Sequence, residues 1–213
     1  MVFRSPNTNQ KRSAERIELS QQSRPELRNS VLILWDLQYG IAPRATNYSD
    51  LLHNARRLLE AFHTSTKPVI YSQHTGVPYE YMTKYQIGSM QRRGLDPKTA
   101  RFMAENSHDW QIIEEVKPSE QDMVVRKHTA SFFVGTMLDT FLKARGVETI
   151  VLSGVSTDAG IEGTARHAAY LGYSPIIVED AVGSSSAEMH EAALKVMRRM
   201  FEIKKTQDII DAL

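Results

Sequence analysis

The sequence contains no cysteine, which excludes disulfide bonds, a thiolate nucleophile and any cysteine-based zinc site. No apolar run approaches the roughly 18–20 residues that a membrane-spanning helix needs, and the N-terminus lacks the apolar segment of a secretory signal. The formal net charge of +1 leaves no large basic field for neutralising phosphates. We therefore expect a soluble, cytoplasmic protein that binds neither nucleic acid nor membrane.

The chain divides by composition into a short polar segment and one domain. Residues 1–29 are rich in Ser, Gln, Arg and Glu and have no sustained apolar period, which indicates an arm. Its basic residues faintly resemble a transit peptide, but Glu15, Glu18 and Glu26 favour an arm that is flexible or packs on a neighbouring subunit. Residues 30–213 are long enough to bury one substantial core.

Short apolar runs alternate with amphipathic stretches throughout that domain. The runs predict strands at 31–35, 68–72, 122–126, 149–153, 174–178 and 201–203. The amphipathic stretches predict helices at 50–62, 135–145, 161–171 and 187–200, with a terminal helical turn near Ile209. This alternation is typical of a three-layer, Rossmann-like α/β fold with about six mostly parallel strands and helices on both faces.

A long polar connection separates the second and third predicted strands. Connections of this length are often functional, so we expect a lid. Tyr79, Tyr81 and Tyr85 lie in it. They are interpreted as lid packing or a subunit interface, with Tyr79 also a candidate for stacking on an unsaturated substrate.

Three residues at strand ends form a candidate site. Ligands of parallel α/β sheets bind at the carboxyl ends of the strands. Asp36 follows the first strand, Lys127 follows the third, and Gly160 lies where the fourth strand leads into a helix. Each has an ordinary structural explanation, but together they predict that Lys127 holds the Asp36 carboxylate while amides near Gly160 bind negative charge.

Four segments carry a resemblance to a known family. Residues 31–38 (VLILWDLQ), 124–136 (VVRKHTASFFVGT), 153–168 (SGVSTDAGIEGTARHA) and 180–194 (DAVGSSSAEMHEAAL) resemble, in this order, segments of isochorismatase-like proteins, also called cysteine hydrolases. The resemblance implies a hydrolase with an Asp–Lys–Cys triad, in which Asp36 and Lys127 take the first two positions. It also implies a cis peptide at Val155–Ser156, a homodimer or homotetramer with the site near an interface, and no cofactor.

The third triad position falls on Gly160, so the covalent thiolate route is closed. Isochorismatases proper resemble this chain in having glycine there, and they hydrolyse a vinyl ether without a nucleophilic side chain. In such chemistry Asp36 would supply a proton if burial raised its pKa, against the opposing effect of Lys127. Gly160 would leave room for the substrate and open its N–H to a carboxylate.

The match to that branch is incomplete. Ser156 replaces a bulky aromatic residue, His74 stands where glutamine is expected, and only Arg92 or Arg93 is available to hold a substrate carboxylate. A pocket hydrogen-bonding role suits His74 better than metal ligation, so no metal is expected. The predicted substrate-binding residues are Gln38, His74, Tyr79, Ser156 and Thr157.

Three hypotheses follow for the function. The first is a cysteine-independent hydrolase of a small, anionic or unsaturated molecule. The second is a non-catalytic binding or scaffold protein that kept the fold. The third assigns the nucleophile to Ser156 or Thr157, although both precede the turn at which a nucleophile would be presented.

Overall fold

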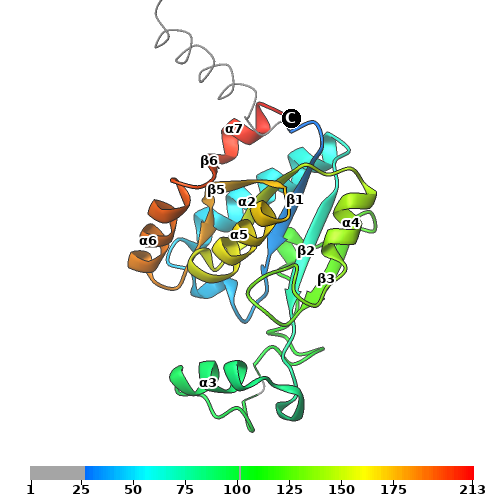
Figure 1. Ribbon diagram of the computed structural model, residues 1–213. Coiled ribbons are helices and arrows are strands. Elements are labelled where there is room, and N and C mark those ends of the chain that lie inside the picture. The colour runs from blue at the N-terminus through cyan, green and yellow to red at the C-terminus, as the bar shows by residue number, and fades with distance from the viewer. Residues whose placement is uncertain (1–26, 101) are drawn as a thin grey trace, which may run out of the picture.

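The computed structural model describes residues 27–100 and 102–213, so nearly all of the arm predicted for 1–29 lies outside the described residues. One sheet of six strands forms the centre of the domain (Figure 1). Its strands are β1 (Ser30–Trp35), β2 (Val69–His74), β3 (Met123–Lys127), β4 (Thr149–Val155), β5 (Ser174–Gly183) and β6 (Glu202–Lys204). Their order is β3-β2-β1-β4-β5-β6, and every neighbouring pair is parallel.

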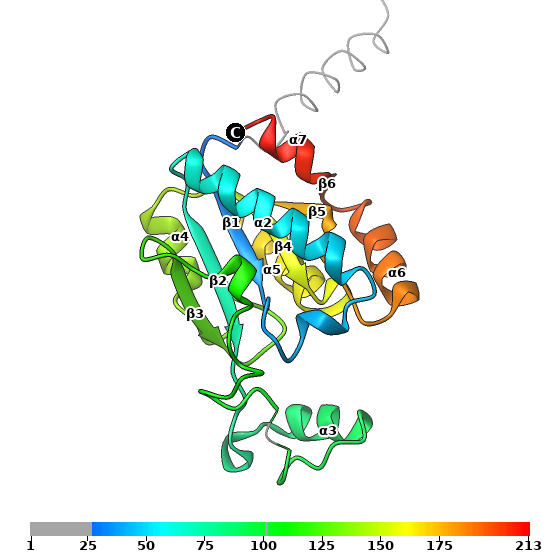
Figure 2. The ribbon, with the colours of Figure 1, turned by 180° about the vertical axis from the view of Figure 1, so that it is seen from behind.

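Helices cover both faces of this sheet, which confirms the predicted three-layer α/β fold (Figures 1 and 2). One face carries α2 (Tyr48–Thr64) and α7 (Thr206–Ile210). The other carries α4 (Leu138–Ala144), α5 (Glu162–Tyr170) and α6 (Ala187–Met197). None of the described helices is both long and apolar enough to cross a membrane.

The central strand β1 shows why its sequence is a continuous apolar run. Leu32 and Leu34 belong to the core on the α2 side, whereas Val31, Ile33 and Trp35 belong to the core on the α5 side. A strand that is buried on both faces has no position for an alternating polar residue. This burial explains why the run was recognisable as a strand although it was too short for a helix.

The long connection after β2 differs from the prediction because it contains a helix. Helix α3 (Lys84–Arg92) begins with a capping box, in which Thr83 Oγ1 accepts a hydrogen bond from the Gln86 amide. Figures 1 and 2 show α3 projecting from the domain, set apart from the two helical layers. The capping box was the available sequence signal, and the weak apolar period of the helix concealed it.

The remaining elements are short turns of helix. They are η1 (Ala42–Arg44), η2 (Tyr79–Tyr81), η3 (Glu114–Val116) and the π-helical turn η4 (Thr157–Ile161). Helix α4 begins later than predicted, after Gly135 at φ +73°, a left-handed conformation that interrupts a regular helix.

The strand order creates the place for a ligand. The chain builds outward from β1 to β2 and β3, and then returns to the other side of β1 with β4. The connections therefore diverge between β1 and β4, and a crevice opens at the carboxyl ends of these strands. Asp36 follows β1 and Ser156 follows β4, so both lie at this switch point.

The packing of α2 on the sheet should dominate the stability of that layer. Phe62 of α2 is fully buried in the core between this helix and the sheet. Phe62→Ala should lower the free energy of unfolding by about 3–5 kcal/mol, because it removes buried apolar surface and leaves a cavity. Urea denaturation measures this loss, and Arg56→Ala is the control, since the exposed Arg56–Glu60 pair is worth at most about 1 kcal/mol. Similar losses in the two variants would contradict this account of the core.

Candidate active site

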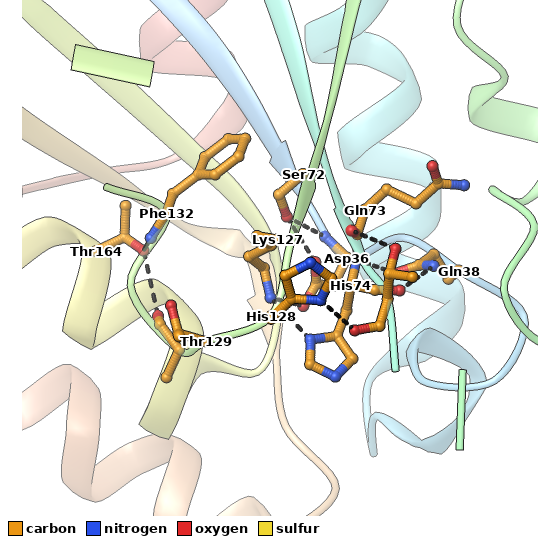
Figure 3. A network of polar contacts seen from close by, with 12 residues as sticks. Asp36, Gln38, Ser72, Gln73, His74, Lys127, His128, Thr129, Phe132 and Thr164 are labelled. Carbon is orange, nitrogen blue, oxygen red and sulfur yellow. Dashed lines mark hydrogen bonds and ion pairs between the residues drawn. The ribbon is translucent and has the colours of Figure 1, made fainter. Parts of the chain in front are cut away.

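A buried ion pair lies at the centre of the crevice. Lys127 Nζ donates to Asp36 Oδ2 over 2.6 Å, and both side chains are almost fully buried (Figure 3). Asp36 follows β1 and has a φ of +48°, while Lys127 ends β3 opposite His74 of β2. Three adjacent strands therefore bring together the two residues that the sequence assigned to one site.

Ser72 completes the support of Asp36 and was not recognised in the sequence. Its hydroxyl donates to Asp36 Oδ1 over 2.6 Å and accepts from the Asp36 amide over 3.0 Å. Ser72 pairs with Trp35 in the β1–β2 register, which places it beside the end of β1. Only the strand pairing reveals this contact, because a serine within a strand carries no functional signal by itself.

Burial shifts the ionisation of both members of the pair toward their neutral forms. It raises the pKa of Asp36, an effect that the Lys127 cation and hydrogen bonds from Lys127 and Ser72 oppose. Burial likewise lowers the pKa of Lys127, against the attraction of Asp36. At a given pH, Asp36 is therefore protonated in a larger fraction of molecules than an exposed aspartic acid.

His74 remains neutral beside this pair. Burial, followed by the charge of Lys127, lowers the pKa of His74 from its ordinary value of 6.5 to about 3. Its Nδ1 atom lies 3.4 Å from Lys127 Nζ. Since an ammonium group can only donate, we assign the acceptor role to Nδ1 and the ring proton to Nε2.

A cavity of about 370 Å³ opens above these groups. The lining residues from the strand ends and the η4 turn are Trp35, Asp36, His74, Lys127, Val155, Ser156, Ala159 and Gly160. The segment around α3 supplies others, among them Met82, Tyr85, Gln86, Met90 and Arg93. The segment expected to form a lid therefore forms one wall of the cavity.

Three predicted substrate-binding residues lie elsewhere. Gln38 is buried and donates to the carbonyls of His74 and Trp110 while accepting from the His74 amide, so it positions His74. Thr157 is buried, and its hydroxyl lies 2.8 Å from His190 Nδ1. Tyr79 lies on η2, with Lys98 Nζ 5.4 Å from its ring centroid. None of the three lines the cavity, which argues against Thr157 as a nucleophile.

The turn after β4 carries Ser156 and Gly160 to the cavity. The peptide Val155–Ser156 is cis, as the family resemblance implies. The amides of Ala159 and Ile161 both donate to the Ser156 carbonyl, over 3.3 and 3.1 Å. These two amides are therefore unavailable for the anion binding that the sequence assigned to this turn.

The described part of the chain holds no cluster of three or more His, Asp or Glu side chains suited to a metal ion. His74 contacts Lys127 instead, and a cation at that distance repels a metal ion. The arrangement can supply a proton from Asp36, an ammonium group beside it, and a neutral imidazole.

Comparison with known proteins identifies the family. The isochorismatase domain matches residues 30–208, and the chain belongs to the isochorismatase family. It is similar to the isochorismatase family protein YecD of Escherichia coli O157:H7, with 31% identity over 87% of this chain and 97% of that protein. It is also similar to the ureidoacrylate amidohydrolase RutB of Acinetobacter baylyi, with 28% identity over 76% and 70% of the two chains.

The fold has solved counterparts. A cysteine hydrolase from Pseudomonas syringae pv. phaseolicola 1448A superposes with a TM-score of 0.77 at 24% identity, over 89% of this chain and 97% of that one. The protein is thus an isochorismatase-family hydrolase.

The neutral state of His74 predicts a dependence of stability on acid. Between pH 6.5 and about 3 the unfolded chain binds a proton at this residue while the folded chain does not. The contribution of His74 is therefore complete above pH 6.5 and is lost as the pH falls. His74→Gln should reduce the loss by up to about 1.4 kcal/mol per pH unit.

Urea denaturation at a series of pH values measures this difference. His53→Gln removes an exposed histidine of α2 and serves as the control. Parallel stability profiles for the parent and His74→Gln would show that His74 is protonated in the folded protein.

Proposed function

We propose that this protein hydrolyses a small anionic molecule by acid-assisted attack of water, with Asp36 as the acid and base and with no covalent intermediate on the chain. The observation that carries the proposal is the buried Asp36–Lys127 pair facing a cavity whose nucleophile position is glycine. Removing two charges from water is costly, so a pair retained at a cavity wall needs a purpose other than stability.

The proposed reaction balances within the site. When Asp36 is protonated, its carboxyl group transfers the proton to the substrate at the bond that breaks, and water attacks the electron-poor centre. The proton that this water releases returns to the Asp36 carboxylate. Lys127 stabilises the carboxylate between the two steps, and Ser72 holds the carboxyl group in one orientation. His74, being neutral, contributes an N–H donor without adding a second buried charge.

The charge of the cavity supports an anionic substrate. Among the described lining residues Asp36 is the one carboxylate, whereas Lys127 and Arg93 are both cationic. The ion pair neutralises Asp36 and Lys127, which leaves the Arg93 guanidinium as a partner for a carboxylate. Of the two arginines considered from the sequence, only Arg93 lines the cavity.

Replacing the acid should abolish the reaction. Asp36→Asn should lower kcat at least about 100-fold, because general acid–base catalysis typically contributes two to four orders of magnitude. Activity is measured on a panel of small carboxylates that carry an amide, a ureido group or a vinyl ether. An unchanged rate in this variant would rule out the proposed role of Asp36. Failure of the parent on the whole panel would favour a non-catalytic binding protein.

A second variant separates chemistry from folding. Asp36→Asn leaves Lys127 buried without its anion, which alone costs stability. The double variant Asp36→Asn/Lys127→Met removes that charge and should recover stability in urea while remaining inactive. Mass spectrometry during single turnover of the parent should detect no adduct on the chain. An acyl adduct on Ser156 would instead support the nucleophile hypothesis.

The substrate-anchoring role of Arg93 can be tested against its neighbour. Arg93→Gln should raise KM about tenfold or more with a smaller change in kcat, since one charge-assisted hydrogen bond is worth about 1.5–3 kcal/mol. Steady-state kinetics on the best panel substrate provides the measurement. Arg92→Gln removes a neighbouring exposed charge that lies outside the cavity lining, and it should leave KM unchanged. Equal effects in both variants would indicate only a long-range effect of charge.

A further inference from the structure

Trp35 occupies the space in which a side chain at position 160 would begin. A Cβ atom built on Gly160 would lie 2.0 Å from Trp35 Nε1 and 2.4 Å from Trp35 Cε2. These distances are far below van der Waals contact, so either the indole or the added side chain would have to move. The space of a side chain at the nucleophile position is therefore filled by Trp35, the last residue of β1.

The indole is held firmly in this place. It is 1% exposed and packs edge-on against the buried Phe132, with ring centroids 5.4 Å apart and an interplanar angle of 89°. Lys127 Nζ lies 4.3 Å from the indole centroid, within the range of a cation–π contact. Because these contacts leave little freedom for rotation, Trp35 and Gly160 act as a large–small pair.

The indole N–H has no acceptor within the part of the chain that the structure describes. Trp35 lines the cavity together with Asp36 and Gly160, and its Nε1 atom lies beside Gly160. An indole N–H can only donate, and a buried one normally finds an acceptor.

We propose that Trp35 is a substrate-contacting residue, whose indole N–H donates a hydrogen bond to a carboxylate or carbonyl oxygen held over Gly160. The same indole prevents any side chain at position 160 from becoming a nucleophile. The inference has a ligand half, the hydrogen bond from the indole N–H to a bound oxygen, and a packing half, the contact of the indole with Gly160. The ligand half rests on the proposed function, whereas the packing half does not.

A double-mutant cycle tests the packing half. Gly160→Ala should raise the unfolding equilibrium constant at least tenfold in the parent and less than twofold in a Trp35→Val background, where the added methyl group has space. Urea denaturation measures all four proteins. An equal cost of Gly160→Ala in both backgrounds would overturn the large–small pairing.

A thiol probe provides a second test of the same pairing. The parent has no cysteine, so Gly160→Cys introduces a single alkylation site. Iodoacetamide should label this cysteine at least tenfold faster in the Trp35→Val background than in the parent background. Equal rates in the folded proteins would contradict the inference, and equal rates after denaturation in urea serve as the control.

The ligand half can be tested without turnover. The chain has two tryptophans, so ¹⁵N-labelled protein gives two indole N–H signals, which Trp35→Phe assigns. Titration with acrylate, fumarate and benzoate should shift the Trp35 signal. The Trp110 signal should move less, because its N–H already donates to Thr75 Oγ1 over 2.9 Å. Trp35→Phe should weaken binding about tenfold.

The outcomes separate this inference from the proposed function. A Trp35 signal that stays unmoved at saturation, or no binding of any of the three acids, would overturn the ligand half. Binding that shifts the Trp35 signal, without hydrolysis of any panel compound, would support Trp35 as the ligand contact while refuting the hydrolytic proposal. Asp36-dependent hydrolysis with full affinity in Trp35→Phe would refute only the role of Trp35.

Discussion

The buried contact between Asp36 and Lys127 is the interaction on which the rest of the site depends. Two charges held out of water are tolerable only when each is close to the other and hydrogen-bonded. The 2.6 Å ion pair and the Ser72 hydroxyl meet this requirement, and they do so because β1, β2 and β3 are adjacent and parallel. The burial that makes this pairing necessary for folding also raises the pKa of Asp36.

The absence of cysteine gains a structural meaning beside this pair. Gly160 is not an open position that has lost its side chain, because the indole of Trp35 lies where that side chain would start. The indole also contacts Phe132 and lies over the Lys127 ammonium. Trp35, at the end of β1, thus links Asp36, the Lys127 ammonium group and Gly160 into one packed unit, and a side chain placed at position 160 would meet the indole.

Sequence reasoning predicted the sheet and the contact between Asp36 and Lys127, but it predicted the pocket lining unevenly. Asp36, His74, Lys127, Ser156 and Gly160 all line the cavity, since they lie at or shortly after strand ends. Gln38 and Thr157 belong to motifs of the same kind, but their side chains turn inward to the His74 backbone and to His190. Motif position does not specify side-chain direction, because local backbone turns decide which residue faces the ligand.

Local pattern was sufficient for most of the elements and for the class of protein: short buried runs, amphipathic stretches and the family-like segments indicated an α/β hydrolase whose sequence contains no cysteine. The tertiary structure alone decided how those pieces meet. Strand order brought Ser72 to Asp36, and the shape of the η4 turn placed Gly160 against Trp35. Such contacts join residues that lie far apart in the chain, and their distances depend on sheet register and side-chain packing, which the spacing of residues in a sequence does not encode.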